Sequence, residues 1–140
     1  MFFGEYSHSL DEKGRIRIPS KLKVGLSEYV ATKGVNNCIY IFNKSYFETE
    51  FLENINRISA YSLTGQNAVR TILSSTFEIV EDSQGRFTIP TSLKEFAGIT
   101  KNIVSVGVGK RIEIWDEETW KDYNSKTSFA DAIKELNGNA

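Results

Sequence analysis

The chain has 140 residues, a formal net charge of −1 and a pI of about 5.9. A near-neutral chain of this length is typical of one domain. It argues against a protein that coats nucleic acid through bulk positive charge, although it leaves room for a local cationic surface. Because Cys38 and His8 are each the only residue of their kind, the sequence indicates no disulfide, metal site, cofactor or catalytic residue.

The chain is one structural unit written twice. Residues 11–22 return as residues 82–93, with Asp, Gly, Arg, Ile, Pro and Leu repeated 71 positions later. Beyond this segment the offset becomes 73, and the correspondence continues as far as Phe47 and Trp120. We predict a single domain over residues 1–140, with repeat 1 over about 4–59, repeat 2 over about 75–124 and a C-terminal helix over about 128–136.

Each copy predicts a β-hairpin closed by a tight turn. An Asp at the first turn position and a Gly at the fourth are typical of a type I turn whose glycine has positive φ. In the first copy the strands are expected over residues 5–10 and 15–18. A proline then ends the pairing, because it has no N–H to donate. The turn and strand-end residues are Asp11, Gly14 and Pro19 in the first copy, and Asp82, Gly85 and Pro90 in the second.

An arginine follows each turn. Side chains alternate along a strand, so Ile16 is expected to point into the core and its neighbours Arg15 and Arg17 outward. Arg86 points outward in the same way in the second copy. A pair between Asp11 and Arg15 could simply stiffen the turn, and an exposed pair is worth less than about 1 kcal/mol.

The charge around the first turn favours a second interpretation, a surface for a polyanion. Cations exceed anions by three within one short segment, on a chain whose net charge is −1. The charged residues of this segment are Lys13, Arg15, Arg17, Lys21 and Lys23, with Asp11 and Glu12.

Short strands and helices are predicted for the rest of the chain. Strands are expected over residues 29–32, 38–42, 76–80, 103–108 and 111–115. Helices are expected over 45–59, 64–74, 94–97, from Asp116 past Tyr123, and 128–136, with Ser45, Thr64, Asp116 and Ser128 as N-caps. Neither half can cover its own apolar face, so the two hairpins are expected to interlock about a pseudo-twofold axis. The predicted fold is α+β, a small swapped-hairpin β-barrel of two internal repeats with helices packed outside.

Three stretches of the chain resemble the MraZ family of bacterial transcription regulators. They are residues 3–15, 82–90 and 107–115, and the resemblance extends over nearly the whole chain. It implies an AbrB-like fold and a ring-shaped homo-oligomer of about eight subunits. It also implies association with the nucleoid and binding to tandem direct repeats at the promoter of the division and cell-wall gene cluster. The paired family motif DxxxR falls on Asp11 with Arg15 and on Asp82 with Arg86.

One departure from the family concerns two lysines. Lys23 and Lys94 stand where many relatives have arginine. A lysine still reaches a phosphate, but it lacks the planar fork that makes a bidentate contact.

The residue chemistry favours double-stranded DNA on its own account. An arginine just past a turn can enter the major groove and pair with guanine O6 and N7, which contributes about 1–3 kcal/mol of discrimination. We expect Arg15 and Arg86 to contact bases, Gln84 to contact DNA beside them, and the flanking cations to contact phosphates. The phosphate contacts are predicted for Lys13, Arg17, Lys21 and Lys23. Because the second copy lacks most of these lysines, the first should carry more of the salt-dependent affinity.

Affinity considerations predict that several subunits bind together. A dissociation constant near 10 nM needs about −11 kcal/mol, which a few side chains on one chain do not supply after the costs of association. Linked copies facing the same way should favour direct repeats about 10 bp apart. A curved ring meets straight DNA at few subunits, so the ring or the duplex is expected to deform.

Two alternatives stay open. One is an antitoxin-like or scaffolding protein-interaction module, which the acidic pI and the glutamates of the helix over 45–59 favour. The other is RNA binding, which is less favoured because a strand face with exposed aromatic residues is missing. No membrane segment, leader peptide or small-molecule substrate is indicated, so a cytoplasmic protein is expected.

Overall fold

The computed structural model describes residues 1–138. Repeat 1 contains β1 (Phe2–Ser9), β2 (Arg15–Arg17), α1 (Ser20–Lys23), β3 (Tyr29–Lys33) and β4 (Ile39–Asn43). A helical run follows, made of α2 (Lys44–Tyr46), the π-helical segment η1 (Phe47–Phe51) and α3 (Leu52–Asn56), and then α4 (Leu63–Ser74). Repeat 2 contains β5 (Phe77–Ile79), β6 (Arg86–Thr88), α5 (Thr91–Phe96), β7 (Asn102–Gly109), β8 (Arg111–Asp116) and α6 (Glu117–Ser125), and α7 (Phe129–Leu136) comes last.

The strands of the two repeats interleave. Six of them form a sheet in the order β1-β7-β8-β4-β3-β5, and β2 pairs with β6 in a separate ribbon. All of these pairs are antiparallel. Ile16 lies opposite Phe87 in the ribbon, and Tyr40 lies opposite Glu113 at the centre of the sheet. Each of these two pairs joins equivalent positions of the two repeats. A pseudo-twofold axis therefore passes between the two residues of each pair.

Two predictions about the strands were wrong or are not confirmed. β1 and β2 do not pair with each other beyond the turn, since β1 pairs with β7 and β2 with β6. The chain segments on either side of the turn are hydrogen-bonded to each other between Asp11 and Arg15. Beyond these residues each strand pairs with a strand of the other repeat. The predicted closed barrel is not confirmed, because β1 and β5 are the two ends of an open sheet among the described residues. The structure is therefore a mixed α/β fold with an antiparallel sheet.

The main core lies between the sheet and the β2–β6 ribbon. Both repeats contribute equivalent side chains to it, which is what an interleaved pair of repeats requires. These include Ile16, Ile18, Leu22, Ile39 and Ile41 from the first repeat, and Phe87, Ile89, Leu93, Ile112 and Ile114 from the second. A smaller cluster of Val30, Phe42 and Phe47 attaches the α2–η1–α3 run to the sheet.

Four helix starts test the predicted N-caps. The side chains of Asp116 and Ser128 cap α6 and α7 as predicted, by accepting from Thr119 N and Asp131 N. The other two predictions were wrong. α2 begins at Lys44 after Asn43, not after Ser45. α4 begins at Leu63, where Ser62 rather than Thr64 is the cap. In both cases the N-cap position lies two residues earlier than predicted. Ser62 accepts a hydrogen bond from Gly65 N, whereas the Asn43 side chain bonds to Ser27 N and Gly25 O.

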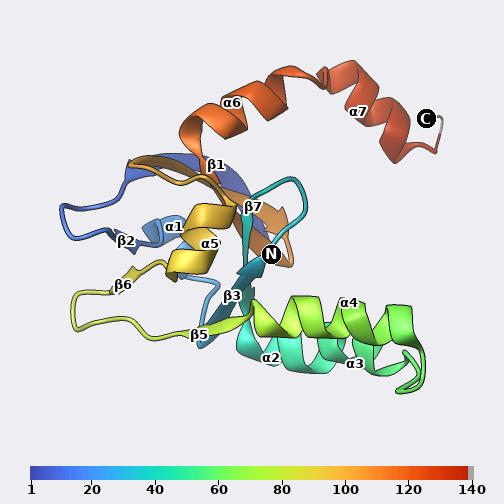
Figure 1. Ribbon diagram of the computed structural model, residues 1–140. Coiled ribbons are helices and arrows are strands. Elements are labelled where there is room, and N and C mark those ends of the chain that lie inside the picture. Colours follow the sequence, from blue (N-terminus) through green and yellow to red (C-terminus); the bar gives the residue numbers. More distant parts are fainter. Residues whose placement is uncertain (139–140) are drawn as a thin grey trace.

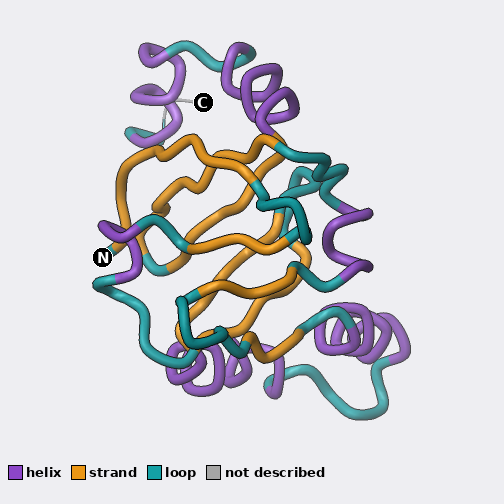
Figure 2. The backbone as a smooth tube through the Cα atoms, turned by 90° about the vertical axis from the view of Figure 1, so that its left-hand side faces the viewer, coloured by secondary structure: helices purple, strands orange, loops and turns teal. Residues whose placement is uncertain are grey.

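The arrangement in space sets the two turns apart from the helices. In Figure 1 the loop from β1 to β2 and the loop from β5 to β6 both project to the left of the sheet. α2, α3 and α4 lie below the sheet, whereas α6 and α7 lie above it. Figure 2 looks onto the side from which the turns project. No helix within residues 1–138 has the length and apolar character needed to cross a membrane.

Candidate nucleic-acid interface

Turn 11–15 and turn 82–86 have the same backbone geometry. In the first, Gly14 N donates to Asp11 O at 3.0 Å and Asp11 N donates to Arg15 O at 2.9 Å. In the second, the equivalent distances are 3.0 Å and 2.7 Å. Gly14 and Gly85 both have φ of 75°, in the left-handed region that favours glycine. The repeated motif therefore builds the same turn twice.

An aspartate organises each turn. Asp11 Oδ1 accepts from the backbone N–H groups of Lys13 at 2.9 Å and Arg15 at 2.8 Å. Its Oδ2 accepts from Arg15 Nε at 2.8 Å. Asp82 makes the matching bonds to Gln84 N, Arg86 N and Arg86 Nε, each at 2.9 Å. Hydrogen bonds to the ionised form, first of all from the arginine backbone N–H, lower the pKa of both carboxyl groups.

These bonds use only one side of each guanidinium. Nε of Arg15 and of Arg86 donates to its aspartate, and the Nη groups of neither residue donate a hydrogen bond within residues 1–138, where the two side chains are 27% and 25% exposed. A guanidinium held at Nε presents its two Nη groups as a planar fork in a defined direction. The turn thus does both things considered for it: the ion pair stiffens the loop, and it also aims an arginine outward.

The β2–β6 ribbon adds a third arginine between the turns. Ile16 and Phe87 point into the core, with exposed fractions of 1% and 5%. By alternation their neighbours lie on the outer face, where Arg17 stands opposite Arg86 and Arg15 opposite Thr88. The strand register therefore brings Arg15, Arg17 and Arg86 together on one surface. We call this surface the arginine face.

The predicted lysines do not all lie beside the first turn. Lys13 is on that turn and Lys21 is on α1, and both are exposed. Lys23, by contrast, is bound at the second turn. Its Nζ lies 3.0 Å from Oε2 of Glu81, the residue before Asp82. The same oxygen accepts a hydrogen bond from the Tyr29 hydroxyl at 2.6 Å.

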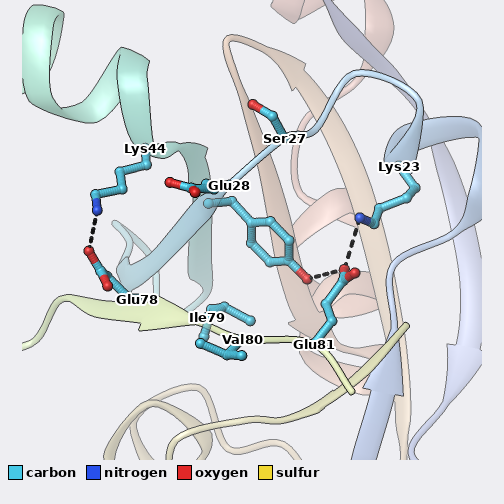
Figure 3. A pocket seen from close by; sticks show the side chains of 9 residues that line it. Lys23, Ser27, Glu28, Lys44, Glu78, Ile79, Val80 and Glu81 are labelled. Atoms are coloured by element: carbon cyan, nitrogen blue, oxygen red, sulfur yellow. Dashed lines mark hydrogen bonds and ion pairs between the residues drawn. The ribbon is translucent and has the colours of Figure 1, made fainter. Parts of the chain in front are cut away.

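Figure 3 shows this cluster at one side of a hollow of about 490 Å³, with the ion pair of Lys44 and Glu78 on the other side. Burial, followed by the neighbouring Glu81 carboxylate, raises the pKa of Tyr29. Lys23 is therefore held by side chains next to turn 82–86 and is not grouped with Lys13 and Arg15.

Two lysines lie beside the first turn: Lys94, which the sequence indicates as a possible phosphate contact without placing it there, and Lys101, which the sequence does not single out. Lys94 of α5 and Lys101, just before β7, line a hollow of about 670 Å³ together with Asp11, Glu12 and Gly14. Lys94 Nζ lies 4.0 Å from the point that a Cβ on Gly14 would occupy. Because the repeats interleave, the lysine beside each turn comes from the other repeat. No local pattern in the sequence signals this, because it follows from the pairing of β1 with β7 in the structure.

Other candidate chemistry is weak within residues 1–138. His8 Nε2 lies 2.7 Å from Ser105 Oγ, and burial lowers its pKa. No three His, Cys, Asp or Glu side chains in this part of the chain gather into a metal site. Cys38 is buried, and burial raises its pKa to about 12. None of these groups competes with the arginine face as a candidate site.

A known protein family matches both repeats of the chain. The family model described as "MraZ protein, putative antitoxin-like" matches residues 1–67 and 72–137. The chain belongs to the MraZ family. The resemblance seen in the sequence is thereby confirmed, and the two matched segments follow the two repeats.

Relatives of the MraZ family match almost the full length of the chain. The protein named transcriptional regulator MraZ from Clostridium beijerinckii is 44% identical over 139 residues, which cover 96% of this chain and 95% of that protein. The protein of the same name from Syntrophomonas wolfei is 40% identical over 140 residues, covering 97% and 96%. One from Clostridium botulinum is 45% identical over 139 residues, covering 96% and 95%.

Proposed function

We propose that the protein is a transcription regulator that binds double-stranded DNA in a sequence-specific manner through the arginine face. The observation that carries the proposal is the open fork of Arg15 and of Arg86, each held at Nε by its own aspartate. A fork that is already oriented loses less entropy on pairing with guanine O6 and N7 than a free arginine does. The names of the MraZ relatives support a regulatory role.

Roles on the DNA follow from position on the arginine face. Arg15 and Arg86 contact base edges, and Gln84, whose backbone is held by Asp82, contacts DNA beside Arg86. Arg17, between the turns, contacts the phosphate backbone, as do Lys13 and Lys21. Lys23 is paired with Glu81, so it contacts a phosphate only when this ion pair is broken.

The finer features implied by the family belong to the same proposal. The interleaved register supports an AbrB-like swapped-hairpin fold. We further propose a homo-oligomeric ring of about eight subunits that binds direct repeats at the promoter of its own division and cell-wall genes, in the nucleoid. One arginine face offers three arginines, so several linked faces are needed for nanomolar affinity.

The test is selection of DNA by the protein itself. A pool of duplexes with a random central region is enriched on the purified protein, and the affinity of the enriched duplex is measured by fluorescence anisotropy against scrambled DNA and against RNA. We expect enrichment of direct repeats about one helical turn apart. Arg57→Ala is the matched control, because Arg57 is an exposed arginine at the end of α3, away from the turns. A pool that stays random, or RNA that competes as well as the enriched duplex, contradicts the proposal.

One observation favours a second candidate function, a protein-interaction module. α7 is amphipathic, and its apolar residues Phe129 and Leu136 are 83% and 81% exposed. An uncovered apolar helix face is a feature of interaction sites. Failure of the selection, together with a stable complex with another protein that depends on Phe129, would favour this alternative.

A further inference from the structure

Lys23 and Lys94 are equivalent residues in different electrostatic situations. They stand 71 positions apart, each directly after a buried leucine on the short helix that follows Pro19 or Pro90. Lys23 is paired with Glu81 at 3.0 Å. Lys94 has no ion pair and no hydrogen bond from Nζ within residues 1–138, and it lies against the first turn.

The difference comes from the residue before each turn. Glu81 precedes Asp82, whereas the equivalent residue before Asp11 is Leu10, which is buried. The position of Tyr29, which also binds Glu81, corresponds to Asn102 in the second repeat, and Asn102 accepts instead from Ser9 Oγ at 3.0 Å. Within residues 1–138 the second turn is therefore preceded by a carboxylate that pairs with the neighbouring lysine, whereas the first is preceded by an apolar residue.

The hollow beside the first turn is suited to an anion. Lys94 and Lys101 line it from the second repeat, and the carboxylates of Asp11 and Glu12 line it from the first. Both oxygens of Asp11 already accept hydrogen bonds from the turn and from Arg15, so its charge is largely compensated. The remaining carboxylate, Glu12, is exposed to solvent.

The charges around the two turns differ accordingly. The first turn has four cations and two anions, Lys13, Arg15, Lys94 and Lys101 against Asp11 and Glu12. The second, counted in the same way with the residues that line its own hollow, has three cations and four anions, Lys23, Lys44 and Arg86 against Glu28, Glu78, Glu81 and Asp82. The local balance is therefore +2 at one end of the arginine face and −1 at the other.

We propose that the hollow lined by Lys94 and Lys101 is a binding site for a DNA phosphate, and that Glu81 withholds Lys23 from the equivalent site at the second turn. This inference rests on the proposed function. Its consequence concerns affinity. The first turn supplies more of the salt-dependent binding than the second, while the orientation of a subunit on the duplex is set by the base contacts.

The test is the salt dependence of binding to the duplex enriched by the wild-type protein, measured between 50 and 200 mM NaCl. The slope of log K against log salt is negative, and loss of one phosphate contact makes it shallower by about 0.9 for each subunit in contact. When NaCl rises from 50 to 200 mM, the affinity of Lys94→Ala should therefore fall by a smaller factor than that of wild type. The two factors should differ about 3.5-fold for each subunit in contact. Lys23→Ala, its equivalent in the other repeat, should leave the slope unchanged.

Glu81→Gln tests the withholding directly. The amide keeps a hydrogen bond to Tyr29 but removes the charge that holds Lys23, so the slope should steepen by about 0.9 per subunit. Glu81→Gln combined with Lys23→Ala should return to the wild-type slope. If the double variant keeps the gain, Glu81 acts by repelling DNA and not through Lys23, and this part of the proposal is overturned.

The outcomes separate the inference from the function on which it rests. Binding that is specific in wild type but has the same salt slope in Lys94→Ala, or equal slopes in Lys94→Ala and Lys23→Ala, overturns the phosphate site alone. No enrichment of DNA by wild type overturns the proposed function. Circular dichroism of each variant checks that the fold is retained, which is expected because the two lysine side chains lie at the surface or are half-buried.

Discussion

Turn 11–15 and turn 82–86 are nearly superimposable in their hydrogen bonds, since the three bonds of Asp11 and the three of Asp82 differ by no more than 0.1 Å. Their surroundings are not alike, because Lys94 beside one turn has no ion pair within residues 1–138, whereas Lys23 beside the other is bound to Glu81. The geometry of a turn is set by a five-residue motif, whereas its charge is set by the opposite repeat. The two copies of a duplicated unit can thus keep the same backbone geometry while the net charge around their turns differs.

Among single substitutions, the largest effect on discrimination between DNA sequences is expected from changing either arginine while keeping its charge. Arg15→Lys and Arg86→Lys lose the planar fork, so each should reduce discrimination between the enriched and a scrambled duplex by about 5- to 150-fold, which corresponds to 1–3 kcal/mol. Because both forks are held alike, the two losses should be similar. Competition anisotropy measures them, and an unchanged ratio for either variant removes that arginine from base recognition.

A loss of stability is expected for Tyr29→Phe, because the Tyr29 hydroxyl binds Glu81 beside the second turn. The Tyr29 hydroxyl donates to Glu81 at 2.6 Å, and Tyr29 is only 3% exposed. A hydrogen bond to a charged group contributes about 1.5–3 kcal/mol, so unfolding in urea should lose about 2 kcal/mol at a fixed protein concentration. Tyr61→Phe is the control, because Tyr61 is 99% exposed. Equal midpoints for the two variants would show that the hydroxyl bond is not important for the fold.

A smaller and equal loss is expected when each turn glycine becomes alanine. Gly14 and Gly85 have φ of 75°, a conformation that costs a residue with a Cβ about 1 kcal/mol. Nothing blocks the added methyl group at Gly85, and at Gly14 the nearest atom is Lys94 Nζ at 4.0 Å. Gly14→Ala and Gly85→Ala should therefore lose the same amount in urea, although their electrostatic surroundings differ. Glu12→Ala and Ser83→Ala serve as controls, and unequal losses would mean that the two turns are not the same structure.

The smallest effect is a dependence on pH. The folded-state pKa of Asp11 and of Asp82 is lowered by hydrogen bonds, so each ionised carboxylate stabilises the fold above its usual pKa near 3.8. That stabilisation is lost as the pH falls through the lower folded pKa. Asp11→Asn and Asp82→Asn should be less stable than wild type at pH 6, and the difference should shrink at pH 3. A difference that stays constant with pH would indicate a neutral hydrogen-bonding role.

Part of this structure could be read from the sequence, and the repeat explains which part. The motif predicts the turn, the positive φ of Gly14 and the inward direction of Ile16, because all three depend on residues within a few positions. It does not predict where each strand goes after the turn, so β1 was assigned to β2 although it pairs with β7.

The same limit applies to the candidate site. Lys23 and Glu81 are distant in the chain, and no local pattern signals their ion pair. Lys94 and Lys101 reach the first turn only because the repeats interleave. The sequence therefore places the arginines on the turns, because they belong to a local motif, but it does not place Lys23, Lys94 and Lys101, whose surroundings depend on tertiary pairing.

The most direct test of the central claim is the affinity of the Arg15→Glu, Arg86→Glu double variant for the enriched duplex. If the arginine face contacts DNA, reversing both charges should lower the affinity by at least about 100-fold, since two base contacts and two favourable charges are lost. Arg57→Glu, at the far end of the molecule, should bind like wild type. An intact double variant, folded by circular dichroism, that still binds the duplex as tightly as wild type would contradict the account.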